Sequence, residues 1–467
     1  MDDSPGPRVA VVGAGPAGFY AAEAVLRSHE TATVDIIDRL PTPYGLVRFG
    51  VAPDHQKMKV VTRLYERTLK DPRTRYLGNV TYGRDLNLED LRRHYHAVVF
   101  AVGAATDRRL GVEGEDLEGS LSATDFVAWY NGHPDAADHD FASLLAGARE
   151  AVVIGNGNVA IDVTRVLAKS VGELAATDIA DHALEALSGS GIERVTIVGR
   201  RGPAEAKFTT KELRELGELE NADVEVRAAE MTLSPASRAA ADADVTTGKN
   251  VEVLTAFSEQ PKLGKPRTVA LRFQLQPVGL VGDGKVSAVV FERTRLEDVD
   301  GQVRAVSTGE HETLPAQLVL KSVGYTGLPL PDLPFDERRG VVPNEAGRVL
   351  DAPGGTPLPG LYVAGWIKRG ASGVIGTNKA DAMESVAALV EDLAAESGRS
   401  AQASGGDRTA AAVDHLLLTR GVDAFSSEDW FDLDAEEVAA GEAAGRPRVK
   451  TVRLQEMIAT ARRRRGG

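Results

Sequence analysis

The stretch that decides the fold reads RVAVVGAGPAG and runs from Arg8 to Gly18. An apolar, β-forming run leads into three glycines spaced as GxGxxG, and helix-forming residues follow as far as Arg27. Glycines at this spacing permit a tight turn and let the backbone approach a pyrophosphate, which also meets the N–H groups of the helix. The stretch therefore predicts a strand, a turn and a helix that bind a dinucleotide. The predicted contacts are Gly13, Gly15, Ala17 and Gly18.

The next predicted strand ends at an acidic residue. Thr33 to Ile37 is rich in β-forming residues, and Asp38 follows it, 25 residues after Gly13. A carboxylate there can accept hydrogen bonds from a ribose 2′-hydroxyl. Because GxGxxG by itself also occurs in ordinary glycine-rich turns, the two strands and the acid are what favour nucleotide binding.

A second unit of the same kind begins at residue 151. Ala151 to Ile154 is a β-forming run, a GxGxxA turn follows at residues 155–160, and a helical stretch continues to Ser170. Alanine at the last position still allows a helix to pack closely on a sheet. The next β-forming run spans Val195 to Val198. These features predict a second pyrophosphate site.

Two arginines follow this strand in place of an acid. Arg200 and Arg201 stand between Gly199 and Gly202, and paired guanidinium groups suit a 2′-phosphate better than a free hydroxyl. The sequence therefore favours NADP(H) over NAD(H), with a solvated pair of strand-end arginines as the alternative. The inserted segment 172–191 makes the spacing looser than in the usual motif.

A later segment suits a flavin. Gly360 to Trp366 reads as a strand that ends in a tight turn, and Gly373 to Gly376 opens a helical stretch. The dipole of such a helix can stabilise negative charge at the pyrimidine end of a reduced flavin ring. Taken alone, the segment fits an ordinary helix start equally well, so the flavin assignment depends on the first glycine-rich turn.

The composition excludes several classes of protein. The 467 residues include no cysteine, which excludes disulfides, iron–sulfur clusters held by this chain and a dithiol relay, and we expect no metal site. A formal charge of −14 argues against binding to nucleic acid or anionic membranes. No apolar stretch approaches the roughly 20 residues that a membrane-spanning helix needs. Residues 1–6 lead into a strand without a targeting segment, so we expect a cytoplasmic location.

The end of the sequence predicts a linker and an appendage. Residues 397–406 are small and polar, as in a flexible connection, and we expect the part after them to be peripheral. Arg462 to Arg465 are interpreted as a solvated tail, and no function is assigned to them.

Several strings of residues together resemble one family. They are LPTPYGLVR at Leu40–Arg48, GVAPDH at Gly50–His55, GNGNVA at Gly155–Ala160, GRRGP at Gly199–Pro203, and GWIKRG with GVIGTNK between Gly365 and Lys379. Over nearly its whole length the chain resembles the adrenodoxin-reductase-like ferredoxin–NADP reductases, in particular their actinobacterial branch. The resemblance implies that a hydride passes from NADPH to FAD and that single electrons then leave to an iron–sulfur ferredoxin. A cytochrome P450 could be an indirect further partner.

The resemblance also implies site residues. His55 and Glu215 would form an active-site pair with a supporting role, because the cofactors themselves carry the chemistry. Read without the resemblance, His55 fits a loop histidine equally well, and Glu215 fits a solvated helix residue better. The implied FAD contacts are Gly13, Gly18, Asp38, Leu46, Trp366, Gly373, Val374 and Ile375, with Thr81 as a further cofactor contact. The implied NADP contacts are Arg108, Asn156, Gly157, Asn158, Val159, Arg200, Arg201 and Glu212, and Gly373 would touch both cofactors.

Trp366 departs from the pattern of the wider disulfide-reductase superfamily, which usually has Asp at this position. An Asp there would reach the ribityl–phosphate region of the flavin through its carboxylate. Backbone contacts must replace it in this chain, while the indole offers a flat surface near the ring system.

The expected architecture is an α/β protein with two Rossmann-like dinucleotide-binding domains of the glutathione-reductase type, the NADP domain being inserted into a discontinuous FAD domain. The expected limits are 1–107 for the first part of the FAD domain, 108–326 for the NADP domain, and 327–467 for the second part with its C-terminal appendage. Residues 97–101 and 317–320 are interpreted as paired strands at the crossing between the domains.

Three functions remain open at this point. The leading hypothesis is a ferredoxin reductase whose acceptor meets the flavin directly, because no dithiol can relay electrons. An NADPH-dependent quinone reductase or diaphorase would use the same cofactors, and a nucleotide-binding scaffold without turnover belongs to another class. Ferredoxins are usually acidic, so the first hypothesis predicts a basic docking surface despite the acidic total charge. Its candidate residues are Lys207, Lys211, Arg214 and Arg227.

Overall fold

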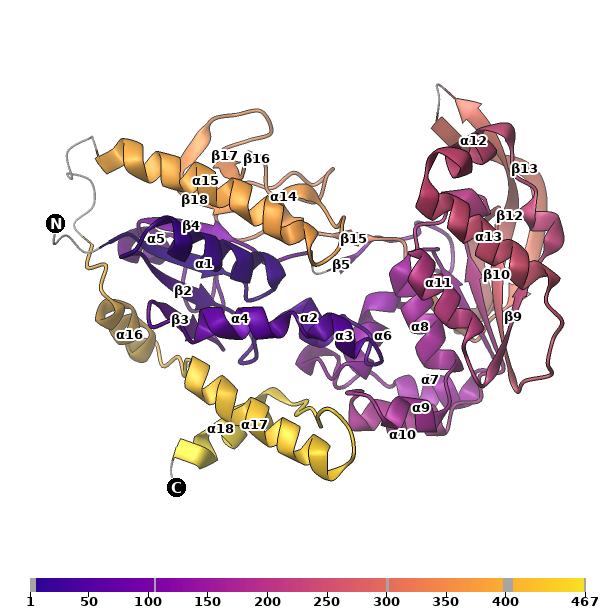
Figure 1. Cartoon of the computed structure of the whole chain (residues 1–467), viewed down its shortest axis with the longest axis horizontal. Coiled ribbons are helices and arrows are strands. Elements are labelled where there is room, and N and C mark those ends of the chain that lie inside the picture. The colour runs from indigo at the N-terminus through magenta and orange to yellow at the C-terminus, as the bar shows by residue number, and fades with distance from the viewer. Residues whose placement is uncertain (1–5, 105, 300–301, 398–405, 466–467) are drawn as a thin grey trace.

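The computed structural model describes residues 6–104, 106–299, 302–397 and 406–465. Residues 1–5, most of the predicted linker and the side chains of Arg464 and Arg465 lie outside the described residues. Figure 1 shows two lobes, each built around its own sheet, and the C-terminal helices beside them. Within the described residues, no helix combines the length and the apolar character that crossing a membrane requires.

The first lobe is built on a seven-stranded sheet in the order β16-β17-β18-β4-β1-β2-β3. Its parallel strands are β1 (Arg8–Val12), β2 (Thr33–Ile37), β3 (Thr74–Leu77), β4 (Ala97–Phe100) and β18 (Pro357–Val363). The antiparallel strands β16 (Asn344–Glu345) and β17 (Arg348–Leu350) extend one edge. Because Val12 lies opposite Ile37, Gly13 and Asp38 meet at the carboxyl edge of the sheet.

Helices cover both faces of this sheet (Figure 1). In the largest core of the lobe, Phe19 and Ala22 of α1 (Pro16–Ser28) pack with Val386 and Leu389 of α15 (Thr377–Ser397). A second core contains Leu91 of the helix α5. The other helices of this lobe are α2 (Leu46–Phe49), α3 (Gln56–Lys59), α4 (Thr62–Leu69), α5 (Leu88–His94) and α14 (Trp366–Arg369).

The second lobe has a six-stranded parallel sheet in the order β6-β14-β7-β8-β10-β9. Its strands are β6 (Ser120–Ser122), β7 (Glu150–Ile154), β8 (Arg194–Val198), β9 (Ala222–Val226), β10 (Arg267–Arg272) and β14 (Leu318–Lys321). Its helices are α6 (Ala123–Tyr130), α7 (Phe141–Gly147), α8 (Asn158–Ala168), α9 (Val171–Ala175), α10 (Asp181–Ser188), α11 (Thr210–Gly217), α12 (Pro235–Ala243) and α13 (Val245–Glu259), with 3₁₀ turns at Pro134–Ala136, Pro203–Glu205 and Ala228–Met231.

A long antiparallel sheet, which the sequence patterns did not predict, packs on this lobe. It consists of β11 (Leu275–Asp283), β12 (Lys285–Val299) and β13 (Gln302–Pro315). Its buried residues Leu280, Val289 and Phe291 share a core with Val152 and Ile154 of the parallel sheet. This sheet therefore backs the second nucleotide unit.

The crossing between the lobes differs from the prediction. The runs 97–101 and 317–320 do not pair, because β4 belongs to the first sheet and β14 to the second. The strands that pair at the crossing are β5 (Thr106–Asp107) and β15 (Tyr325–Thr326), which run antiparallel. A pair of two-residue strands is too short to leave a hydrophobic pattern in the sequence.

The expectation of a peripheral C-terminal appendage is wrong. The segment forms α16 (Ala410–Thr419), α17 (Ser427–Ala443) and α18 (Leu454–Arg465). Trp430 and Leu433 of α17 and Met457 of α18 are buried in the core of the first lobe, while Val452 packs against the core of the second. The C-terminal segment therefore contacts both lobes.

Candidate cofactor and active site

In the first glycine-rich turn, protein atoms crowd two of the three glycines, and the third faces free space. A Cβ at Gly13 would lie 2.5 Å from the carbonyl oxygen of Ala101, and one at Gly18 would overlap the carbonyl oxygen of Gly13. At Gly15, by contrast, a Cβ would meet nothing within 4 Å. Gly13 and Gly18 are thus required by the fold, and Gly15 leaves free space beside the N-terminus of α1. That space fits a pyrophosphate.

The second turn repeats this arrangement. A Cβ at Gly155 would overlap the carbonyl oxygen of Ser322, whereas one at Gly157 would meet nothing within 4 Å. Ala160, in the place of the third glycine, is fully buried between helix and sheet. Asn158 also connects the turn to α11, because its Oδ1 accepts a hydrogen bond of 2.8 Å from the N–H of Thr209 at the start of that helix. The second turn therefore also fits a pyrophosphate.

Asp38 is fixed beside the first turn by backbone donors. Its Oδ2 accepts a hydrogen bond of 2.7 Å from the N–H of Ala14, and its Oδ1 accepts one of 2.9 Å from the N–H of Leu40. Burial raises the pKa of Asp38, and the two N–H donors act against that rise. Each oxygen keeps a second lone pair, so the carboxylate can still accept ribose hydroxyls. Thr81 lies nearby, because the N–H of Val80 donates to the carbonyl oxygen of Asp38 at 2.9 Å.

Arg200 and Arg201 lie beside the second turn. A Cβ at Gly199 would be only 2.6 Å from Nδ2 of Asn156, so the arginine loop touches the turn directly. Thr294 Oγ1 donates to the carbonyl oxygen of Arg200 at 2.8 Å, and the N–H of Gln274 donates to that of Arg201 at 3.0 Å. Arg200 is exposed, and among the described residues neither guanidinium group forms an ion pair. The backbone is held while the charges stay available to an anion.

The expected flavin segment lies next to the first turn. A Cβ at Gly365 would be 2.6 Å from Cβ of Ala17, so the start of α14 touches the start of α1. Trp366 Nε1 donates to the carbonyl oxygen of Ser372 at 3.2 Å, and its ring lies 5.2 Å from that of Tyr325 in β15. Residues 373–376 form a loop, since α15 begins at Thr377, and Val374 is 59% exposed. These residues remain open to a ligand.

Two further predicted contacts are exposed near the same region. Leu46 is 43% exposed in α2, and a Cβ at the preceding Gly45 would lie 3.0 Å from Cα of Gly15. Arg108 follows β5, where its N–H donates to the carbonyl oxygen of Gly324 at 2.9 Å while its side chain stays exposed. Leu46 therefore lies beside the first turn, and Arg108 lies at the crossing between the lobes.

His55 and Glu215 meet across the two lobes. His55 precedes α3 in the first lobe, is 7% exposed, and places its Nε2 2.8 Å from Oε2 of Glu215 in α11 of the second lobe. Its Nδ1 lies 3.8 Å from Oδ1 of Asp162 in α8. Burial raises the pKa of Asp162 to about 6. The imidazole is thus held between two carboxylates.

Arg165 organises this junction, and the sequence patterns did not single it out. It is 1% exposed and binds Asp54, the residue before His55, through Nε at 2.6 Å and Nη2 at 2.8 Å. It also lies 2.9 Å from Asp162 and 3.4 Å from Glu215. The ion pair with Arg165 lowers the pKa of Asp54 against the effect of burial, and Lys169 adds to this at 2.9 Å. The sequence could have indicated Arg165 through an Asp and an Arg three positions apart in a largely apolar helix.

Glu212 completes the junction. Burial raises the pKa of Glu212, and Thr209 Oγ1 donates to its carboxylate at 3.1 Å. His55, Asp162 and Glu212 offer ligand atoms that all lie within 4.8 Å of one another. Because Arg165 already supplies the positive charge beside Asp162, we interpret the group as a proton-holding cluster rather than a metal site.

Comparison with known proteins agrees with this geometry. Residues 7–257 match the family model for pyridine nucleotide-disulphide oxidoreductases. The chain is 46% identical to the NADPH-ferredoxin reductase FprA of Mycobacterium tuberculosis, over 96% of this chain and 98% of the relative. It is 42% identical to the mitochondrial NADPH:adrenodoxin oxidoreductase of Arabidopsis thaliana, over 97% and 95% of the two chains.

Solved structures give the same relationship. A structure of M. tuberculosis FprA in complex with NADPH superposes with a TM-score of 0.91 at 45% identity, covering 97% of this chain and 99% of that one. The predicted α/β fold is confirmed: the sheet of the second lobe is parallel throughout, and that of the first lobe is parallel except for β16 and β17 at one edge. The chain belongs to the pyridine nucleotide-disulphide oxidoreductases and, within them, to the family of adrenodoxin-reductase-like ferredoxin–NADP reductases.

Proposed function

We propose that the protein is an FAD-dependent ferredoxin–NADP reductase that passes electrons from NADPH to an iron–sulfur ferredoxin. One observation carries this proposal. Two turns, each open at its middle glycine, lie on two separate sheets, and they differ at the end of the following strand, where one has Asp38 and the other has Arg200 and Arg201.

The first lobe would hold FAD. Gly15 would provide space for the pyrophosphate, Asp38 would accept the ribose hydroxyls, and Leu46, Trp366 and residues 373–375 would border the flavin ring. When bound, FAD accepts an electron pair and releases single electrons, which joins a two-electron donor to a one-electron acceptor. No cysteine is present to form a dithiol relay, so the acceptor must meet the flavin itself.

The second lobe would hold NADPH. The turn 155–160 leaves space for its pyrophosphate, and the charges of Arg200 and Arg201, which form no ion pair with any described residue, suit its 2′-phosphate. Arg108, which follows β5, and Glu212 in α11 would also contact the coenzyme. His55 and Glu215 would hold a proton at His55 Nε2, and Arg165 would keep their two lobes in register.

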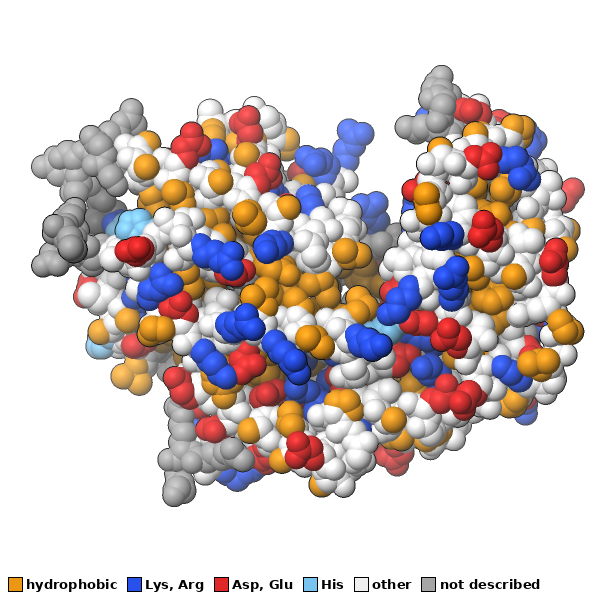
Figure 2. All heavy atoms as spheres, viewed as in Figure 1, with side chains coloured by type: hydrophobic (Ala, Val, Ile, Leu, Met, Phe, Trp, Pro, Cys, Tyr) orange, Lys and Arg blue, Asp and Glu red, His pale blue; other side chains and the backbone are white. Residues whose placement is uncertain are grey.

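Basic side chains lie on the surface of the second lobe. Figure 2 shows Lys and Arg side chains over α11 and beside α13. Lys207, Lys211, Arg214 and Arg227 are all exposed, although Arg227 lies 3.3 Å from Glu312 and Lys211 lies 3.7 Å from Glu215. These charges support docking of an acidic ferredoxin.

Steady-state turnover with purified ferredoxins and with quinones tests the proposed acceptor. We expect a specificity constant for ferredoxin well above that for any quinone. A larger constant for quinones would instead identify an NADPH-dependent quinone reductase or diaphorase. Purification without yellow colour and without uptake of added FAD would leave only a nucleotide-binding scaffold.

Charge reversal tests the docking surface. Lys207→Glu with Arg214→Glu should raise the KM for ferredoxin and leave ferricyanide reduction unchanged, because only the protein acceptor needs the surface. Lys211 is left intact because it contacts Glu215. An equal effect on both acceptors would contradict docking at this surface.

We also propose the domain limits, a cytoplasmic location and a cytochrome P450 as an indirect partner. The domain limits 1–107, 108–326 and 327–467 are supported by the β5–β15 pair, which lies at both crossings of the chain. A cytoplasmic location is tested by cell fractionation. Delivery of electrons through the ferredoxin to a cytochrome P450 is tested by reconstituting substrate turnover with all three proteins.

A further inference from the structure

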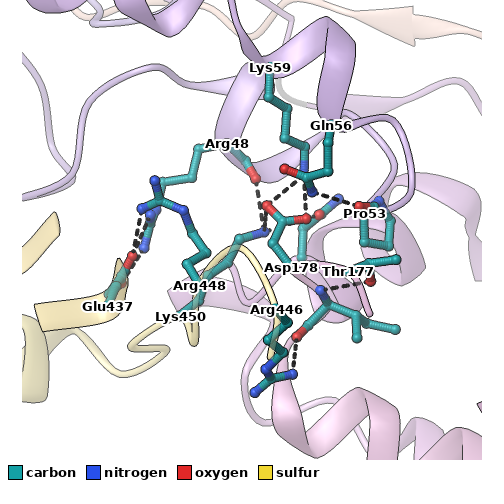
Figure 3. A network of polar contacts seen from close by, with 12 residues as sticks. Arg48, Pro53, Gln56, Lys59, Thr177, Asp178, Glu437, Arg446, Arg448 and Lys450 are labelled. Carbon is teal, nitrogen blue, oxygen red and sulfur yellow. Dashed lines mark hydrogen bonds and ion pairs between the residues drawn. The ribbon is translucent and has the colours of Figure 1, made fainter. Parts of the chain in front are cut away.

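A small basic pocket lies where the two lobes meet the C-terminal segment (Figure 3). Its volume is about 190 Å³, room for roughly six water molecules at about 30 Å³ each. Residues from α2, α3 and α4 form one side, and Asp178 with the segment after α17 forms the other. None of the residues of the two glycine-rich turns lines it. The pocket is thus distinct from the two turns.

Positive charge dominates the walls of this pocket. Five cationic side chains line it, namely Arg48, Lys59, Arg63, Arg448 and Lys450. The carboxylates that pair with them are Asp178, Glu437 and Asp434. Five cationic side chains thus face three carboxylates, with Arg63 solvated at the rim. Keeping the buried cations charged away from water is costly unless a further counter-charge is present.

The two lysines share one carboxylate, and Lys450 is buried while Lys59 is partly buried. Lys59 Nζ donates to both oxygens of Asp178 at 2.7 and 2.8 Å, and Lys450 Nζ lies 3.3 Å from Oδ2 of the same group. The side chain of Lys450 is only 1% exposed. Burial, together with the nearby cations Lys59, Arg48 and Arg448, holds the pKa of Lys450 well below its usual value. One carboxylate is therefore too little to keep both amines fully charged in this pocket.

Two guanidinium groups retain unused donors. Arg48, 5% exposed, makes a two-pronged ion pair with Glu437 at 2.8 and 2.6 Å, yet its Nε has no acceptor among the described residues. Arg63 is exposed at the rim and forms no ion pair in the part of the chain that the structure describes. A buried N–H donor without a partner indicates that an acceptor is missing.

We propose that this pocket binds a small oxyanion with two negative charges, of the class of a phosphate group. Arg48, Lys59, Arg63 and Lys450 would neutralise it through charge-assisted hydrogen bonds. The anion would join α3 and α4 of the first lobe to the segment 446–453 between α17 and α18, which already contacts the second lobe at Asp178 and Ile179. This site goes beyond electron transfer and does not depend on it.

Calorimetric titration with inorganic phosphate tests the site. The FAD-loaded protein is first saturated with NADP⁺, so that the second turn and its arginines are occupied, and ionic strength is held constant with chloride. We expect one phosphate to bind per chain with saturation. The absence of saturable binding would overturn the proposal.

Variants locate the site. Lys450→Met should abolish phosphate binding, and Arg63→Ala should weaken it at least tenfold. Arg67→Ala is the matched control, because Arg67 lies one turn further along α4, is exposed and does not line the pocket. If Lys450→Met does not fold, the comparison of phosphate binding by Arg63→Ala and by Arg67→Ala still tests the site. Equal weakening by both arginine variants, or by neither, would overturn the proposal.

The same titration with a sugar monophosphate identifies the source of the phosphate group. Tighter binding of the ester than of free phosphate would support a phosphorylated metabolite as the ligand. Tighter binding of free phosphate would support the inorganic ion. Binding of either that survives Lys450→Met unchanged would contradict the assignment to this pocket.

Discussion

The two glycine-rich turns have the same backbone arrangement. They differ in the residues that follow the second strand of each unit. Gly13 donates to the carbonyl oxygen of Ile37 at 2.8 Å, and Gly155 donates in the same way to Val198 at 2.9 Å. After Ile37 comes Asp38, whose carboxylate two backbone N–H groups hold in place. After Val198 come Gly199 and the two arginines, whose charges stay unpaired among the described residues.

This comparison shows where the choice of cofactor lies. The middle glycine, Gly15 or Gly157, gives space for any pyrophosphate and cannot distinguish one dinucleotide from another. An anchored carboxylate suits a ribose hydroxyl, and free guanidinium groups suit a phosphate. Two copies of one backbone arrangement can therefore receive different cofactors and give electron flow a direction.

The largest expected effects come from filling the open glycines. Gly15→Val and Gly157→Val each place atoms where the protein has none within 4 Å of a Cβ, so both variants should fold. Gly15→Val should purify without flavin, with FAD affinity lowered by at least about 4 kcal/mol, or roughly 1,000-fold. Gly157→Val should stay yellow and lose reduction by NADPH. Flavin absorbance and NADPH-dependent bleaching measure the two effects, and loss of both cofactors in both variants would show that the turns are not independent.

Removing the arginines should have the next largest effect. Because Arg200 is exposed, each charge-assisted hydrogen bond to the 2′-phosphate falls near the low end of its range, about 1.5 kcal/mol. Arg200→Ala with Arg201→Ala should therefore lower kcat/KM for NADPH about 100-fold and leave NADH unchanged. Arg238→Ala, an exposed arginine of the same lobe, serves as the control. An unchanged preference for NADPH would contradict the assignment of the 2′-phosphate.

A pH-dependent effect is expected where the two units meet. The folded protein raises the pKa of Asp162 from 3.8 to about 6, so it binds this proton more tightly than the unfolded chain. This contribution is present at low pH and is lost as pH rises from about 4 to about 6, and the free energy of unfolding should fall by between about 1 and 3 kcal/mol. Asp162→Asn should remove this part of the slope. Urea unfolding between pH 4 and pH 7 measures the free energy of unfolding of the unchanged protein and of the variant. The same dependence on pH in both would refute the raised pKa of Asp162.

The smallest expected effect concerns Asp38. Asp38→Asn keeps an acceptor for the ribose but loses the charge and one of the two acceptors for the N–H groups of Ala14 and Leu40. FAD affinity should fall by about 1 kcal/mol, or roughly fivefold. Quenching of flavin fluorescence on titration with apoprotein measures it, with an unchanged KM for NADPH as the internal control. No change in FAD affinity would mean that Asp38 serves only the turn.

Local patterns sufficed to predict both nucleotide units. A strand, a glycine turn and a helix are each encoded within about a dozen residues, and the strand ends place Asp38 and Arg200 beside the turns by the register of parallel strands alone. The pairing of His55 with Glu215 could not be obtained in this way. It came from the family resemblance, since the two residues lie on different lobes.

Contacts between distant segments left no comparable signal. Arg165 reads as one of a few polar residues in a largely apolar helix until the fold brings Asp54 and Glu215 to it. Lys450 and Asp178 look like ordinary surface charges in the sequence, yet both are buried where the C-terminal segment meets the second lobe. Such ion pairs depend on how whole elements pack, which neither periodicity nor spacing encodes.

Anaerobic stopped-flow absorbance of the flavin tests the central claim, that the two units hold different cofactors in sequence. The FAD-loaded protein is mixed with NADPH or NADH, and then with oxidised ferredoxin. We expect the flavin absorbance to fall at far lower concentrations of NADPH than of NADH and to return when ferredoxin is added. Equal reduction by the two coenzymes, or no return of the absorbance with ferredoxin, would contradict the account.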